Sequence, residues 1–332
     1  MSKKENLVVV SCALTPEERR KLEAPLERVA TVLYLDDCKD RVSLLKEADV
    51  LISFFFNREI HKEEYPLLKK LRLLQTLSAG VDYLPFSEMP QHFFIACNAG
   101  GWAYQIAEHV VALTMALARH LVPLHLKLAQ GEFDREKYVL RNLKGMTAGI
   151  VGFGGIGQRI ATLFKAFGMK IMALNTSGKT TIPVDFIGTL YQLPQVLKES
   201  DVVLLALPLT KQTKGFIGTK ELSIMKKDAI LINVARAPLI IEKDLYEHLK
   251  RNPSFQVGLD VWWKEPTWGR DNFHVDYPFL ELPNVLGSPH NSNYVAGAMA
   301  EACEVAARNI ALFLEGKRWH GSIDREDYVL TD

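Results

Sequence analysis

Short apolar runs alternate with amphipathic stretches over residues 1–100. Helices are predicted at 40–48, at 63–71 and after Thr15, where Pro16 and two acidic residues follow a capping side chain. The apolar runs between these stretches are typical of buried strands. We therefore predict strands at 7–12, 29–35, 49–55, 72–77 and 93–97. Strands that alternate with helices indicate a parallel sheet covered by helices.

The same alternation returns after residue 147 and predicts a second doubly wound unit. Its predicted strands are 148–151, 170–174, 201–207, 229–234, 257–261 and 284–287. Its predicted helices are 158–167, 190–199, 219–225 and 242–250. One more amphipathic helix is expected at 295–315, where Gly316 ends it.

The longest helical segment is predicted at 102–130, where apolar residues recur at helical spacing. Pro123 should kink or end this helix. A helix this apolar is expected to be buried, either in the core or in a subunit contact. The polar stretch 131–144 is expected to be a surface connector.

Composition narrows the classes of protein that the pattern allows. A chain of 332 residues favours two domains, and a formal charge of +1 gives no reason to expect binding to nucleic acid or to an anionic membrane. No apolar run reaches the length of a membrane span, and the N-terminus has no signal-peptide pattern. The four cysteines are far apart and form no metal-binding pair, which predicts reduced thiols in a cytoplasmic protein and no metal site.

A glycine-rich turn follows the first strand of the second unit, with Gly152, Gly154 and Gly157 in the G-x-G-x-x-G spacing. Gly152 permits a tight turn, Gly154 lets a pyrophosphate approach the backbone, and Gly157 allows close packing of helix on strand. An ordinary tight turn has the same pattern. The strand before it and the helix after it favour a dinucleotide site.

Three polar residues follow predicted strands of the second unit: Arg236, Glu265 and His290. An arginine at a strand end suits a carboxylate, and a histidine beside a carboxylate suits proton transfer. Each of these residues alone is more often a partner in a surface ion pair or the cap of a strand end than a catalytic group. Their joint position at the edge that bears the glycine turn favours a catalytic group.

The chain has five ordered motifs, at residues 151–157, 207–210, 232–236, 258–266 and 289–290. In these motifs it resembles a known family, the D-isomer-specific 2-hydroxyacid dehydrogenases, and the resemblance covers nearly the whole chain. Residues 77–82 and 107–109 extend it into the first half. From the residues alone, the small residues 78–82 could equally form a plain turn or an anion-binding backbone.

The resemblance implies an α/β fold with two doubly wound parallel-sheet domains and a cleft between them. Residues 102–290 would form a Rossmann-type NAD(P)-binding domain. Residues 1–101 and 291–332 would form a discontinuous, flavodoxin-like substrate domain, with hinges near residues 101 and 290. The family is usually dimeric through its nucleotide-binding domain, so a homodimer is expected.

The resemblance also implies roles for single residues. Arg236 would bind the substrate carboxylate, His290 would be the general acid or base, and Glu265 would pair with His290 and raise its pKa. Backbone N–H groups of Ala79 and Gly80 would bind the same carboxylate. The implied cofactor-binding set is Gly152, Gly154, Gly155, Ile156, Gly157, Asn175, Leu207, Pro208, Thr213, Val234, Ala235, Asp260 and His290, with Asp260 at the nicotinamide carboxamide.

The sequence departs from the family pattern at two informative places. Asn175 stands where members that use NAD usually have an aspartate, and Lys179 could meet a 2′-phosphate, so NAD or NADP remains open with a leaning to NADP. Residues 54–56 are three phenylalanines at a strand end, where Phe55 is expected to bind substrate and at least one ring to pack in the core. Such a pocket disfavours a phosphoester.

The function predicted from the sequence is an NAD(P)-dependent oxidoreductase that interconverts a small 2-oxo acid and a D-2-hydroxy acid. One alternative is a formate- or phosphite-type dehydrogenase of the same fold. Another is a nucleotide-sensing scaffold like the corepressors of this family, although the long tails of those proteins are not expected here.

Overall fold

The computed structural model describes residues 6–266 and 273–328, which divide into two compact units. Unit 1 contains the described residues up to Trp102 and from Val295 onward, and unit 2 contains Ala103–Tyr294. Each unit has one sheet whose strand pairs are all parallel. The prediction of two parallel-sheet α/β domains is confirmed.

Unit 1 is built on a five-stranded sheet with the order β2-β1-β3-β4-β5. This is the flavodoxin-like order, in which the order of strand addition reverses between β1 and β3. The strands are β1 (Asn6–Val10), β2 (Ala30–Tyr34), β3 (Val50–Ser53), β4 (Leu73–Thr76) and β5 (Phe94–Ala96).

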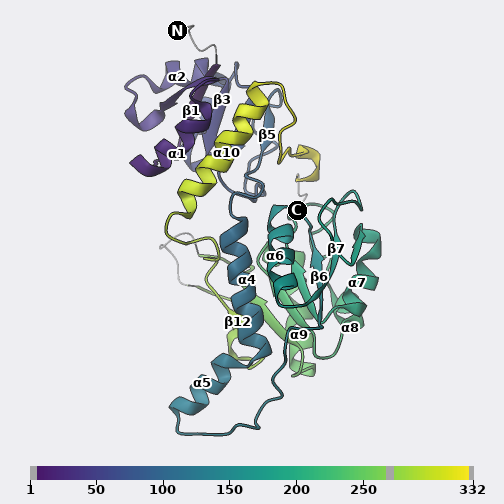
Figure 1. The fold of residues 1–332 in the computed structure, drawn as a ribbon. Helices are drawn as coiled ribbons and strands as arrows, with labels where there is room; N and C mark the ends of the chain where they lie inside the picture. The colour runs from purple at the N-terminus through teal and green to yellow at the C-terminus, as the bar shows by residue number, and fades with distance from the viewer. Residues whose placement is uncertain (1–5, 267–272, 329–332) are drawn as a thin grey trace. The chain divides into compact units, whose positions relative to one another are not determined.

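Helices cover both faces of the sheet in unit 1. Helices α1 (Pro16–Leu26) and α10 (Ala298–Leu314) lie side by side over one face (Figure 1). The other face is covered by α2 (Arg41–Glu47), α3 (Phe56–Glu59) and a 3₁₀ segment at Lys62–Leu67. Alternate residues of a strand point to opposite faces, so β1 sends Val8 and Val10 into one core and Val9 into the other.

Unit 2 is built on a seven-stranded sheet with the order β12-β11-β10-β9-β6-β7-β8. The strand order reverses between β6 and β9, which is where ligands of Rossmann-type sheets bind. The strands are β6 (Thr147–Val151), β7 (Lys170–Leu174), β8 (Phe186–Gly188), β9 (Val202–Leu205), β10 (Ile230–Asn233), β11 (Gln256–Leu259) and β12 (Val285–Gly287). Strand β8 was not predicted, because it is a short edge strand and only Gly188 in it is buried.

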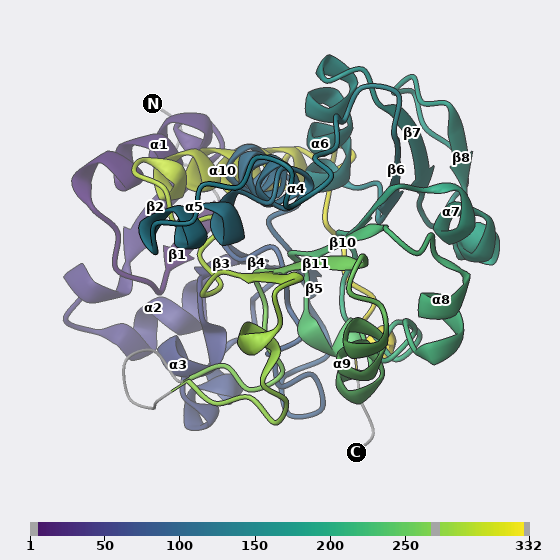
Figure 2. The ribbon, with the colours of Figure 1, turned by 90° about the horizontal axis from the view of Figure 1, so that it is seen from below.

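The helices of unit 2 form two layers. Helices α4 (Ala103–Ala118) and α6 (Gly155–Ala166) pack together on one side of the sheet, as Figure 2 shows. Helices α7 (Leu193–Glu199), α8 (Thr219–Ile224) and α9 (Glu242–Arg251) follow one another on the other side. The carboxyl ends of the strands, between the layers, carry the loops of the candidate site.

The prediction of one helix at 102–130 with a break at Pro123 is wrong. The chain breaks earlier, at His120, which has a left-handed φ of 48°, and α5 (Leu121–Ala129) follows. Pro123 lies in the first turn of α5, where a missing N–H removes no helical hydrogen bond. Helix α4 is buried as expected, but α5 has no buried residue, and α10 is the longest described helix with 17 residues.

Two other local predictions in unit 1 also need correction. The helix expected at 63–71 is a 3₁₀ segment that contains Pro66, and the strand expected to reach residue 55 ends at Ser53. Phe56 instead opens the short helix α3 and is fully buried. Tertiary packing of this one ring therefore turns the chain away from the sheet.

No single helix among the described residues has both the length and the apolar character of a membrane span. Helices α4 and α5 meet those criteria only as a pair, and they are bent by 58° with respect to each other.

Candidate active site

The glycine turn after β6 lies at the switch point of the sheet in unit 2. Gly152 has a left-handed φ of 104°, and a Cβ there would collide with the backbone that follows β9. A Cβ on Gly157 would collide with the Gly152 carbonyl oxygen, so helix and turn pack too closely for any larger residue. A Cβ on Gly154 would have no atom within 4 Å, so this side of the turn is open.

Helix α6 begins at this open side. Its N-cap is Gly154, and no side chain accepts a hydrogen bond from its first turn. Free N–H groups at a helix start carry partial positive charge and attract anions. Gly155 and Ile156 form this first turn, so the open backbone and the free donors fit the pyrophosphate of a dinucleotide.

The loop after β7 contains Asn175 at the position of the expected ribose contact. Its side-chain amide donates to the Lys179 carbonyl at 2.9 Å and accepts from the backbone N–H of Ser177 and of Gly178. Asn175 thus closes its own turn, while Lys179 is exposed. The contact with a ribose stays a prediction.

The remaining expected cofactor residues also occupy strand-end loops. The Thr213 hydroxyl donates to the Pro208 carbonyl at 2.7 Å and accepts from the Thr210 N–H, which closes the loop after β9. Leu207 is buried in the same loop. Val234 and Ala235 follow β10.

His290 and Glu265 lie together although they are 25 positions apart in the chain. His290 Nδ1 is 2.7 Å from Glu265 Oε2, and the Trp262 N–H donates to Glu265 Oε1 at 3.0 Å. Both side chains keep about a third or more of their surface exposed, at 40% for His290 and 34% for Glu265. His290 also has a left-handed φ of 52°, which is uncommon for a residue with a side chain.

The electrostatics of Glu265 link it to Arg236. Burial raises the pKa of the Glu265 carboxyl, but the hydrogen bond and charge of His290, the Trp262 N–H and the charge of Arg236 together outweigh it. The net result is a pKa below the ordinary value of 4.5. Glu265 is therefore held as a carboxylate between a histidine and an arginine.

Arg236 directly follows the turn that ends β10. The buried Asn233 shapes this turn, because its amide donates to the Arg236 carbonyl at 2.9 Å and accepts from the Ala235 N–H at 3.1 Å. The Arg236 guanidinium also donates to the Ala235 carbonyl at 2.8 Å. A half-buried guanidinium is thereby held at the strand end.

Asp260 has no exposed surface, and this chain's own donors surround its carboxylate. It accepts from the Ser288 hydroxyl at 2.6 Å, from the Asn291 N–H at 3.1 Å and from the Ser292 N–H at 3.0 Å. His109 Nε2 lies 2.9 Å from the same hydroxyl. Asp260 therefore holds a side chain before His290 and two backbone N–H groups after it, and its contact with a nicotinamide carboxamide stays a prediction.

The expected substrate residues of unit 1 follow β3 and β4. Ala79 and Gly80 are half-buried, and the Ser78 hydroxyl donates to the Gly80 carbonyl at 2.9 Å. The Phe55 ring is half-buried and lies edge-on to Phe54, with ring centres 4.5 Å apart. Arg236, Glu265 and His290 are thus brought together within unit 2, whereas Phe55, Ala79 and Gly80 belong to unit 1.

The two tryptophans after β11 pack within unit 2. Trp262 is buried, and its indole N–H donates to the Ser288 carbonyl at 2.9 Å. Trp263 donates to the Ile240 carbonyl at 3.0 Å and stacks on Phe279.

Ser288 and Glu59 had no predicted role. Ser288 precedes the Pro-His pair, and Glu59 follows the three phenylalanines within one helical turn. Those positions are the signals that point to them, but only the fold brings each one to its partners.

Comparisons with known proteins agree with this arrangement. The family model described as D-isomer specific 2-hydroxyacid dehydrogenase, NAD binding domain, matches residues 111–292. This match confirms the predicted nicotinamide dinucleotide cofactor.

Several relatives are similar over most of the chain. Glyoxylate reductase of Pyrococcus furiosus is 33% identical over 82% of this chain and 81% of its own length. Hydroxypyruvate reductase of Thermotoga maritima is 29% identical over 84% and 91%. D-3-phosphoglycerate dehydrogenase of Methanocaldococcus jannaschii is 31% identical over 87% of this chain, which spans only 53% of that protein.

Solved structures show the same fold. A D-isomer specific 2-hydroxyacid dehydrogenase family protein from Aeromonas salmonicida is 27% identical with a TM-score of 0.76, covering 97% of this chain and 99% of its own. A glycerate dehydrogenase related protein from Thermoplasma acidophilum is 28% identical with a TM-score of 0.64, covering 92% and 99%.

Proposed function

This chain belongs to the family of D-isomer specific 2-hydroxyacid dehydrogenases, and we propose that it interconverts a 2-oxo acid and a D-2-hydroxy acid with Arg236, Glu265 and His290 as catalytic residues. The observation that carries this proposal is the 2.7 Å hydrogen bond between His290 Nδ1 and Glu265 at the strand ends of an NAD-binding unit. A histidine oriented by a carboxylate is suited to move a proton near neutral pH.

Proton transfer would use the second nitrogen of the His290 ring. Glu265 holds Nδ1, so Nε2 is the nitrogen that can face a substrate oxygen. In reduction, Nε2 would donate a proton to the oxygen on C2, and in oxidation it would accept that proton. The Glu265 carboxylate would stabilise the positive charge on the ring while it holds the proton.

Substrate orientation would come from Arg236. Its planar guanidinium can make two parallel hydrogen bonds to the substrate carboxylate. Its charge would also stabilise the negative charge that develops on the C2 oxygen. Following the family resemblance, we propose that N–H groups of Ala79 and Gly80 bind the same carboxylate and that Phe55 contacts the substrate side chain.

The cofactor would be held by the glycine turn and the loops after β7, β9 and β10. Gly154, Gly155 and Ile156 would bind the pyrophosphate through free N–H groups, for which the open side of the turn is the support. A nicotinamide dinucleotide supplies hydride chemistry when it is bound. Asn175 carries no charge that would repel a 2′-phosphate, and Lys179 is exposed beside it, so we propose that NADP(H) is accepted as well as NAD(H).

The direct test is oxidation of NADH and of NADPH in the presence of glyoxylate, hydroxypyruvate, pyruvate or phenylpyruvate. We expect turnover with at least one of these acids. Tight binding of cofactor without turnover of any of them would contradict the proposal and favour a nucleotide-sensing scaffold. Reduction of NAD(P)⁺ by formate or phosphite alone would favour the formate- or phosphite-type alternative.

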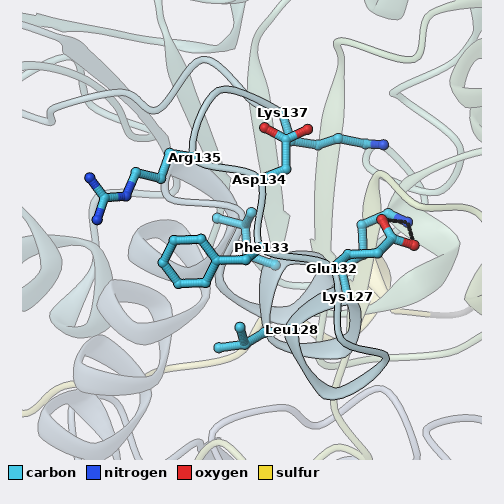
Figure 3. Close-up of a pocket in the computed structure, with 8 residues that line it drawn as sticks. Lys127, Leu128, Glu132, Phe133, Asp134, Arg135 and Lys137 are labelled. Carbon is cyan, nitrogen blue, oxygen red and sulfur yellow. Dashed lines mark hydrogen bonds and ion pairs between the residues drawn. The ribbon is translucent and has the colours of Figure 1, made fainter.

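We also propose a homodimer that uses α5 of unit 2. This helix buries none of its residues, and Leu121, Leu126 and Leu128 each leave 55–56% of their surface exposed. Figure 3 shows Leu128 and Phe133 beside the Lys127–Glu132 ion pair in a hollow formed by α5 and the segment after it. Exposed apolar surface of this kind is typical of a protein contact.

The dimer proposal is tested by sedimentation of the wild type and of Leu126→Asp. We expect the variant to shift towards monomer, and an unchanged mass would contradict the use of α5.

All four cysteines are unpaired, which supports a reducing compartment, and we propose the cytoplasm.

A further inference from the structure

A single carboxylate organises the segment that carries Phe55 in unit 1. Glu59 is the last residue of α3, and its side chain reaches back to the end of β3. It accepts hydrogen bonds from the Phe54 N–H at 3.2 Å and from the Phe55 N–H at 2.7 Å. The hydroxyls of Ser11 and Ser53, at the ends of β1 and β3, donate to the same carboxylate at 2.7 Å each.

These contacts replace the hydrogen bonds that the sheet no longer supplies. Strand β3 ends at Ser53, so the next N–H groups have no ladder partner. Glu59 accepts from both of them with a charged group, which makes stronger hydrogen bonds than a neutral acceptor. The backbone of Phe54 and Phe55 is therefore held in one conformation by one side chain.

The same segment is held from its other side by Tyr83. The Tyr83 hydroxyl donates to the Phe54 carbonyl at 2.8 Å and lies 3.1 Å from the Ser78 hydroxyl. Ser78 in turn donates to the Gly80 carbonyl at 2.9 Å. The peptide of Phe54 thus connects Glu59 to the loop of Gly80.

The ring of Phe55 is also fixed. It lies edge-on to Phe54 and to Tyr83, with ring centres 4.5 Å and 5.9 Å apart. The Arg58 guanidinium lies 5.0 Å from the centre of the ring and covers one of its faces. What remains is a half-buried aromatic surface of defined orientation.

We infer that Glu59 is a positioning residue which sets the preference for the substrate side chain by fixing Phe54 and Phe55. This inference rests on the proposed function, in which Phe55 contacts the group attached to C2 of a 2-oxo acid. An aromatic surface favours an apolar or aromatic substituent over a charged one. Glyoxylate has only hydrogen at that position, so its reduction should be insensitive to where the ring lies.

The test compares phenylpyruvate with glyoxylate in the wild type and in Glu59→Gln. Glutamine has the same shape but no charge, so the Phe54 and Phe55 N–H groups lose a charged acceptor and are held more weakly by a neutral amide oxygen. We expect the ratio of kcat/KM for phenylpyruvate to that for glyoxylate to fall roughly tenfold, because displacement of a substrate-lining group by about 1 Å can change a rate up to a hundredfold. The kcat for glyoxylate should stay within about twofold of the wild type.

Ser11→Ala is the matched control. It removes one donor from the same carboxylate and leaves both amide hydrogen bonds, so the ratio should not change. If Glu59→Gln does not fold, Tyr83→Phe releases the Phe54 carbonyl from the opposite side and should lower the ratio in the same direction.

Three outcomes would overturn the inference. An unchanged ratio in Glu59→Gln, which includes an equal loss with both acids, would make Glu59 a purely structural residue. A wild type that reduces glyoxylate but neither pyruvate nor phenylpyruvate would refute the side-chain preference alone. A wild type that reduces none of these acids, nor hydroxypyruvate, would refute the proposed function itself.

Discussion

At the carboxyl end of each sheet, one carboxylate accepts hydrogen bonds from one or two serine hydroxyls and from two successive backbone N–H groups. In unit 2 the Asp260 carboxylate accepts from one serine hydroxyl and from two successive backbone N–H groups, directly after His290. In unit 1 the Glu59 carboxylate accepts from two serine hydroxyls and from the N–H groups of Phe54 and Phe55. The carboxylate of unit 2 thus fixes the segment of the ionisable His290, and the carboxylate of unit 1 fixes the segment of two phenylalanines.

The two carboxyl ends carry different kinds of chemical group. Charged side chains gather at the end of the sheet in unit 2. There His290 is hydrogen-bonded to Glu265, and the charges of His290 and Arg236 both lower the pKa of Glu265. The end of the sheet in unit 1 presents aromatic rings and backbone N–H groups. We therefore expect substitutions in unit 2 to change the chemical step and substitutions in unit 1 to change selectivity.

The largest effect is expected from His290→Ala. Removal of a general acid should lower kcat roughly 10²- to 10⁴-fold, while the affinity for NADH or NADPH stays nearly unchanged. Steady-state kinetics and fluorescence titration of the cofactor measure the two quantities. An unaltered kcat would show that the proton comes from another group, and the contrast between the two sheet ends would be lost.

The next effect is expected from Glu265→Gln. Glu265 accepts from both His290 and the Trp262 N–H. A glutamine that keeps the Trp262 contact turns its NH₂ group to His290 Nδ1 and removes both the charge and the donation from that nitrogen. Loss of a charged hydrogen bond of about 1.5–3 kcal/mol should lower kcat by roughly ten- to a hundredfold. An unchanged kcat would argue that His290 needs no orientation by this carboxylate.

The same variant should also change how the stability of the protein depends on pH. The pKa of Glu265 is lowered in the folded state, so its carboxylate contributes stability above the ordinary value of 4.5 and loses it as pH falls through the lowered pKa. Because the pair is partly exposed, the contribution should be only about 0.5–1 kcal/mol. The difference in thermal unfolding between wild type and Glu265→Gln should therefore be present at pH 7 and shrink as pH falls below 4.5 through the lowered pKa, and a difference that stays constant would contradict this origin.

Phe55→Ala is expected to act on selectivity. Removal of the ring should raise KM for phenylpyruvate about tenfold and change kcat for the same acid much less. The measurement is a full kinetic series with phenylpyruvate and pyruvate. A kcat loss as large as that of His290→Ala would mean that the end of the sheet in unit 1 takes part in chemistry.

The smallest effect is expected from Asn175→Asp. An aspartate repels a 2′-phosphate and has no N–H for the Lys179 carbonyl, so KM for NADPH should rise a few-fold, by about 1 kcal/mol or less, and KM for NADH should change less. Equal changes with both cofactors would remove this residue from the specificity of the site.

The fold class and the position of the glycine turn could both be predicted from the amino-acid sequence alone. Apolar runs of strand length, separated by amphipathic stretches, leave few alternatives to parallel sheets, because such strands are buried on both faces. The glycine spacing also depends only on local backbone geometry, and Gly152 does adopt the left-handed φ that excludes other residues. Arg236 and His290 could be singled out because both follow strands.

Only the tertiary structure decided the contacts between groups distant in the chain. The hydrogen bond of Glu265 to His290, the burial of Asp260 beneath Ser288 and the reach of Glu59 to Ser11 all depend on which strands become neighbours. Burial of Phe56 ended a strand that the pattern extended, and the left-handed turn at His120 divided a helix before its proline. The local sequence pattern indicates which face of a helix or strand is apolar. Which other element covers that face depends on how the whole unit packs.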